Sequence, residues 1–156
     1  MAVHGYAAPI VSELVGIPYA TLDSWVRTGF FIPEIAQASG KGSRRLYSFS
    51  DVCILKILQL LRVRGLNSET QSQLINLLRT GEKEVEAYGK DDIALFKNGE
   101  FIIEKKERVK SISYEELEDI YFIIPIGRFI KELKRDITAR DIHGVIAKED
   151  GKVKVG

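Results

Sequence analysis

A tight corner between two short apolar segments constrains the fold of this chain more than any other feature. Leu14 and Val15 close a short apolar turn of helix, and Gly16 follows as a residue that tolerates a sharp corner. Pro18 suits the first position of a second helix, because its missing N–H needs no partner there. The pattern predicts helices over residues 8–15 and 18–28 that meet at a steep angle.

The second of these helices has one apolar face and one mixed polar face. Leu22, Trp25 and Val26 fall at positions i, i+3 and i+4, so we expect them to pack inward. Such a helix after a tight corner fits the helix-turn-helix motif, although a helical hairpin inside a core fits these residues too. The side chains that we expect to face DNA bases are Tyr19, Ala20, Thr21, Asp23, Ser24 and Arg27.

Several spaced patterns in the first half resemble the MerR family of DNA-binding proteins. They are Thr-Leu-x-x-Trp, then Arg-x-Gly with two apolar residues, one further residue and Pro, then Arg-x-Tyr-Ser before an apolar helix that Asp51 opens. The matching positions are Thr21, Leu22 and Trp25, then Arg27 and Gly29 to Pro33, then Arg45 to Ser48. The resemblance covers residues 6–80 and implies a winged helix-turn-helix domain that binds double-stranded DNA.

A basic loop after the second helix predicts the wing of such a domain. Short β-type segments at residues 30–32 and 46–49 flank the Gly- and Ser-rich span 38–43. Guanidinium groups grip phosphate oxygens bidentately, and the resemblance implies that Arg45 and Tyr47 hold the DNA backbone. The side chains that we expect at phosphates are Lys41, Arg44, Arg45 and Tyr47.

The second half is predicted to form a small separate domain. The composition becomes strongly charged after Gly81, and Asn98-Gly99 between two apolar runs is a strong hairpin signal. Ser113 begins a capping box that predicts a helix to about Tyr121. The expected fold class is mainly α with small β (α+β). The predicted units are a winged helix-turn-helix over 1–80, a linker over 81–90, an α+β dimerisation or partner domain over 91–140, and a flexible tail over 141–156.

An amphipathic helix is predicted from about Ile126 to Ile137. Its apolar positions are Ile126, Phe129, Ile130, Leu133 and Ile137. This face fits burial on the hairpin of the same chain and also pairing with a second subunit, and the two arrangements can coexist. Because one recognition helix reads too few base pairs for selection, we predict a homodimer held by this helix.

Composition and missing motifs exclude several classes of protein. The chain has 45% hydrophobic and 29% charged residues, a globular balance, and a net charge of +1. Cys53 is the only cysteine, so we expect a reducing, cytoplasmic setting, with no disulfide, metal or cofactor. The sequence has no targeting signal or apolar run long enough to cross a membrane. Without a convergent set of acid, base and nucleophile, we predict no enzyme activity.

The second half departs from many MerR relatives, which continue into a long coiled-coil helix and a ligand- or metal-sensing segment. Asp23 also stands where the family commonly has Arg, and its carboxylate would read cytosine, cap the helix or repel phosphate. We expect a sequence-specific double-stranded DNA-binding protein that regulates transcription as a dimer. The alternatives are an antitoxin whose second half masks a toxin partner, an excisionase-like architectural protein and a structural adaptor.

Overall fold

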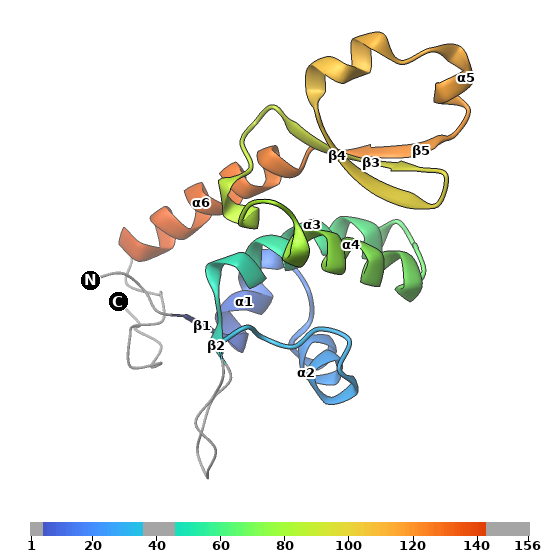
Figure 1. Ribbon diagram of the computed structural model, residues 1–156. Coiled ribbons are helices and arrows are strands. Elements are labelled where there is room, and N and C mark those ends of the chain that lie inside the picture. Colours follow the sequence, from blue (N-terminus) through green and yellow to red (C-terminus); the bar gives the residue numbers. More distant parts are fainter. Residues whose placement is uncertain (1–4, 36–45, 143–156) are drawn as a thin grey trace.

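The chain folds into a helical N-terminal half joined to a three-stranded sheet and a long C-terminal helix (Figure 1). The structure, a computed structural model, describes residues 5–35 and 46–142. The helices are α1 (Ala8–Val15), α2 (Tyr19–Thr28), α3 (Phe49–Val63), α4 (Ser68–Thr80), α5 (Tyr114–Leu117) and α6 (Ile126–Ile142), with 3-10 helices η1 (Val85–Ala87) and η2 (Lys106–Ser111). The strands are β1 (Tyr6–Ala7), β2 (Leu46–Tyr47), β3 (Asp92–Lys97), β4 (Glu100–Lys105) and β5 (Ile120–Ile124). The predicted α+β class is confirmed.

The N-terminal helices begin and end at residues with clear capping roles. The helix predicted over 8–15 is α1, and the next helix begins one residue later than predicted, with Pro18 as its N-cap. The Ser48 side chain accepts a hydrogen bond from the backbone N–H of Asp51, and Asp51 accepts in return from the Ser48 N–H. This capping box starts α3, the central helix of the N-terminal half.

One predicted strand of the wing is not formed. Residues 30–32 follow α2 as irregular backbone, and Phe31 is buried in the hydrophobic core instead. Strand β2 pairs antiparallel with β1, which lies before the first helix, and Ile35 forms an isolated bridge with Leu46. Phe31 therefore anchors the loop to the core, whereas Ile32 is 57% exposed.

The predicted hairpin in the second half is present and forms two of the three strands of the sheet. Strands β3 and β4 pair antiparallel across a turn in which Asn98 and Gly99 both have positive φ, 51° and 79°. Strand β5 adds on the other side of β3, giving the order β4-β3-β5. The helix predicted to reach Tyr121 ends at Leu117, because the β-branched and aromatic residues that follow favour a strand.

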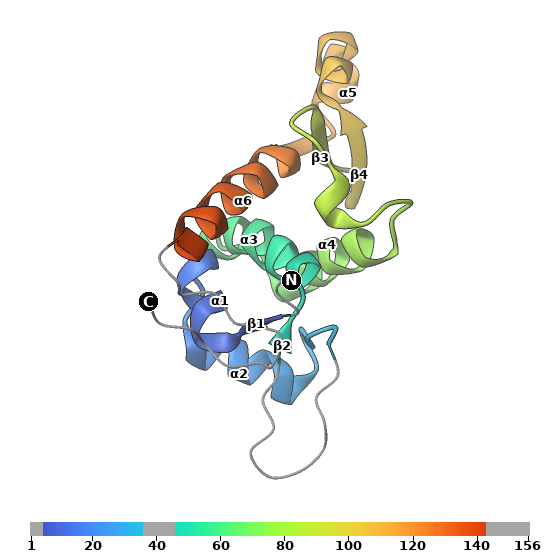
Figure 2. The same ribbon diagram turned by 90° about the vertical axis from the view of Figure 1, so that its left-hand side faces the viewer.

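Helix α6 packs on the N-terminal half as well as on the sheet. It contacts α3, α1 and β3, and it lies beside α3 in both views (Figures 1 and 2). At its start, a side chain on Gly127 would meet the backbone oxygen of Gly89 at 1.5 Å, so only glycine fits there. Val85 and Tyr88, within the predicted linker, are buried in the same core as α3 and α6. These two side chains attach the segment 81–90 to the core, whereas most of its other residues are exposed.

The burial of α6 changes how its apolar face is interpreted. Ile126, Ile130 and Leu133 are at most 1% exposed within a single chain, whereas Phe129 and Ile137 are partly buried. Of the two arrangements considered for this face, the structure shows burial in the same chain. The helix packs against α3 and α1 of the N-terminal half and against β3 of the sheet. A dimer contact through these three side chains would require them to leave the core.

Candidate nucleic-acid interface

The corner between α1 and α2 is held by one glycine and two side-chain hydrogen bonds. Gly16 has φ of 81°, a left-handed conformation that favours glycine. The Ser12 hydroxyl donates to the backbone oxygen of Ile17 at 2.6 Å, and the Gln59 amide donates to the backbone oxygen of Gly16 at 2.9 Å. The second bond connects the corner to α3, so the angle at which α2 leaves the domain is fixed.

Helix α2 presents the side chains that the sequence assigns to DNA contact. Leu22 is 1% exposed and anchors the helix, and the Trp25 ring lies 4.9 Å from that of Phe30 at the helix end. Tyr19 is 54% exposed, and the Arg27 side chain is 65% exposed. Ala20 is exposed as well, and the remaining predicted positions, Thr21, Asp23 and Ser24, are partly exposed. All six therefore lie at the surface of one helix.

Asp23 and Arg27 form an ion pair on this face. The Arg27 Nε donates to the Asp23 Oδ2 at 3.1 Å, across one turn of α2. The Arg27 side chain stays 65% exposed in this contact. The sequence considered locally suggests an acceptor at Asp23, and the spacing of four residues to Arg27 is the signal that indicates the pair.

A second ion pair fixes the loop that follows α2. The Asp51 carboxylate is fully buried and accepts from the backbone N–H groups of Glu34 at 2.7 Å and Ser48 at 2.9 Å. Arg79, from the end of α4, lies 2.9 Å from the same carboxylate and also donates to the Ile32 oxygen at 3.0 Å. Burial raises the pKa of Asp51, and the two N–H groups and the Arg79 charge oppose that rise. The local pattern predicts Asp51 at the start of a helix and carries no signal of its partner Arg79.

The aromatic ring of Phe31 completes this arrangement. The Arg79 guanidinium carbon lies 4.5 Å from the centre of that ring. One arginine thus joins the end of α4 to the start of α3 and to the loop after α2. The exposed helix and the following loop are in this way attached to the same rigid core.

Comparison with known families matches this region of the chain. Residues 9–78 match the MerR HTH family of regulatory proteins, a span that contains α2, α3 and nearly all of α1 and α4. The N-terminal half is a MerR-family domain. Family membership thus agrees with the resemblance carried by the motifs from Thr21 to Asp51.

Relatives of the whole chain include HTH-type transcriptional regulators described as uncharacterized. Those of Mycobacterium bovis and of two Mycobacterium tuberculosis strains are 31% identical to this chain over 151 residues, which is 95% of it. The chain spans 60% of the length of these relatives. The similarity extends past the MerR domain into the sheet and α6.

The wing of the MerR domain lies largely outside the described residues. Lys41, Arg44 and Arg45 all fall in the span 36–45, so their predicted phosphate contacts stay predictions. Tyr47 is described, and it is 1% exposed in the hydrophobic core. It pairs in register with Tyr6 and turns inward, which corrects the prediction that its hydroxyl reaches the DNA backbone.

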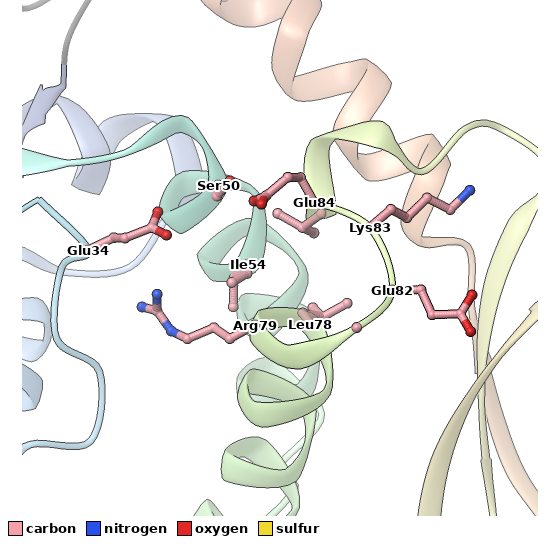
Figure 3. Close-up of a pocket in the computed structure, with 10 residues that line it drawn as sticks. Glu34, Ser50, Ile54, Leu78, Arg79, Glu82, Lys83 and Glu84 are labelled. Carbon is pink, nitrogen blue, oxygen red and sulfur yellow. The ribbon is translucent and has the colours of Figure 1, made fainter.

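A cavity of about 410 Å³ lies next to Arg79, between α3, α4 and the segment that begins at Gly81. Ile54 and Leu78 contribute apolar surface, and carboxylates and cations both line the rim. Arg79 extends toward Glu34, whereas Glu82 and Lys83 point to the far side (Figure 3). Because the rim mixes both charges, the cavity selects no single class of ligand.

The described part of the chain also bears on metal binding, membrane insertion and thiol chemistry. There, no group of three acidic, His or Cys side chains is arranged to hold a metal ion. None of the helices in residues 5–35 and 46–142 has the length and apolar character needed to cross a bilayer. Cys53 is buried, and this burial raises the pKa of its thiol, which disfavours the reactive thiolate.

Proposed function

We propose that this chain is a DNA-binding transcriptional regulator whose α2 enters the major groove of a duplex. The observation that carries the proposal is the exposed face of α2 on a MerR-family domain, with Arg27 at its end. Arginine is the residue that most often pairs with guanine O6 and N7. The relatives named as HTH-type transcriptional regulators support the same role.

The proposal includes a dimer, because one α2 presents too few side chains to select a site within a genome. Two-fold pairing supplies two half-sites at a fixed spacing. The predicted contact is on α6, and of its five apolar positions only Phe129 and Ile137 are partly exposed in the folded chain. The antitoxin and adaptor alternatives stay predictions, and no contact among the described residues favours either of them.

Replacing Arg27 with alanine tests the proposed base contact. A preferred duplex is first selected from a random-sequence pool, and affinities for it and for a random duplex are then measured by fluorescence anisotropy at several salt concentrations. Loss of a base contact is expected to weaken binding to the selected duplex by about 5- to 150-fold, with a smaller effect on the random duplex.

Arg135→Ala is the matched control, since Arg135 is an exposed arginine on α6. It should leave both affinities unchanged. Equal losses for Arg27→Ala and Arg135→Ala would contradict a specific role for α2. Failure of the wild-type protein to bind any duplex at low salt would contradict DNA binding altogether.

The Asp23–Arg27 pair leads to a separate prediction about specificity. If Asp23 holds the guanidinium group in place, Asp23→Ala should raise affinity for random duplex by on the order of 2- to 5-fold, because a carboxylate near the phosphates is lost. Discrimination between selected and random duplex should fall at the base pair that Arg27 contacts. If Asp23 instead accepts a hydrogen bond from cytosine, Asp23→Ala will lose its preference at a base pair other than the one that Arg27 contacts. Arg27→Ala will then keep the preference for that cytosine.

A further inference from the structure

The two edges of the three-stranded sheet differ in how they are protected. Strand β4, at one edge, carries Glu100, Glu104 and Lys105 and contacts α4. Strand β5, at the other edge, reads Ile-Tyr-Phe-Ile-Ile over 120–124, with no charge, glycine or proline. Within the described residues, β3 is the only strand that pairs with β5. Soluble proteins usually place charges, proline or a β-bulge on an open edge to prevent pairing with another chain. Strand β5 has no charge or proline, and its register with β3 shifts only at its first end, between Phe96 and Lys97.

An apolar row crosses the sheet and ends at this open edge. Ile102 and Ile123 both pair in register with Leu95, so the three side chains share one face of the sheet. Leu95 is 1% exposed, whereas Ile102 is 38% and Ile123 is 39% exposed. A strand added beyond β5 would give Ile123 a neighbour on its open side and extend the row.

We propose that β5 is a self-association surface on which β5 of a second copy pairs antiparallel, to form a continuous six-stranded sheet. Such a contact is isologous, since the same strand is used on both copies. The backbone N–H and C=O groups on the outer side of β5 would then find partners, as they do in other cases of strand addition.

The charges at the two ends of β5 select a second copy as the occupant and antiparallel as its direction. Glu118 and Asp119 are exposed just before the strand, and Arg128 and Lys131 are exposed in the first turns of α6 just after it. Arg128 uses its Nε to pair with Glu132 of the same helix, and its side chain is still 70% exposed. Antiparallel pairing brings the acidic end of each copy to the basic end of the other, twice. Parallel pairing would bring like charges together.

The position of β5 leaves the candidate DNA surface free. In both views the sheet lies at the end of the molecule away from α2 (Figures 1 and 2). Pairing through β5 also leaves the core positions of α6 buried, unlike a contact through Ile130 or Leu133. The inference goes beyond DNA binding and does not depend on it, because association is measured without DNA.

A charged residue on the edge strand tests the surface directly. The wild-type chain, of 17.6 kDa, should sediment at twice that mass, and Ile123→Lys should raise the dissociation constant at least about tenfold, because each copy would bring a charge to the row of apolar side chains at the seam. Ile102→Lys is the matched control, with the same register partner and almost the same exposure on the protected edge, and it should stay dimeric.

Two outcomes of this measurement would overturn the proposal. One is a wild-type chain that sediments as a monomer up to its solubility limit. In that case β5 does not pair with a second copy of this chain. The other is an equal loss of association in both variants, which would assign the contact to the face of the sheet rather than to the edge. Circular dichroism of each variant confirms that it is folded.

A charge exchange between exposed residues tests the direction of pairing without touching the core. Asp119→Lys and Arg128→Glu should each weaken self-association on the order of 5-fold, because two attractive contacts become repulsive in each homodimer. An equimolar mixture of the two variants should recover the wild-type dissociation constant, since the mixed dimer has opposite charges at both ends. A mixture that associates no better than either variant alone would overturn antiparallel pairing through β5.

Discussion

Replacing Asp51 with alanine is expected to lower the free energy of unfolding by about 3–5 kcal/mol, the cost of breaking a buried ion pair. The substitution removes the acceptor for two backbone N–H groups, those of Glu34 and Ser48, and leaves Arg79 without its carboxylate. It also removes half of the capping box of α3. Urea unfolding followed by circular dichroism measures the change.

Asp23→Ala is the control for the loss of one carboxylate, because Asp23 belongs to an exposed pair on a helix. That pair contributes about 0.3–0.5 kcal/mol, so its removal should barely move the unfolding midpoint. If Asp51→Ala cost no more than Asp23→Ala, the buried pair would not be what attaches the loop after α2. Arg79→Ala should lie between the two, since Arg79 is itself partly exposed.

Local patterns in the sequence predicted the elements that local interactions determine. The glycine corner, the capping residue of α5 and the Asn98-Gly99 turn each act over a few residues, and all are present. The start of α3 was expected at Asp51, whereas its N-cap is Ser48. The exposed face of α2 was predictable for the same reason. Once Leu22 is fixed inward, helical geometry places Tyr19 and Arg27 outward.

Contacts between distant segments were not predictable from these patterns. The inward turn of Tyr47 depends on pairing with β1, a strand too short to show a pattern of its own. The Asp51–Arg79 pair joins two helix ends, and neither residue carries a local signal of the other. The apolar face of α6 showed that it must be covered, but periodicity alone does not say which element covers it.

The two halves of the chain are expected to unfold together, and Leu133→Ala tests this coupling. Leu133 is fully buried on α6, in the core cluster that also contains the residues of α1 and α3. Its truncation should cost about 2–5 kcal/mol. Trp25, the only tryptophan, lies in α2 and reports on the MerR domain, whereas circular dichroism reports on the whole chain.

If the core is shared, both signals should shift to the same lower urea midpoint in Leu133→Ala. Leu117→Ala is the matched control, because Leu117 is in the same half but 51% exposed, and it should change either midpoint little. A division into separate domains at 81–90 predicts the opposite, namely an unchanged Trp25 transition in Leu133→Ala. Burial of Val85 and Tyr88 in the common core favours a single transition, since separating the halves would expose both side chains to water.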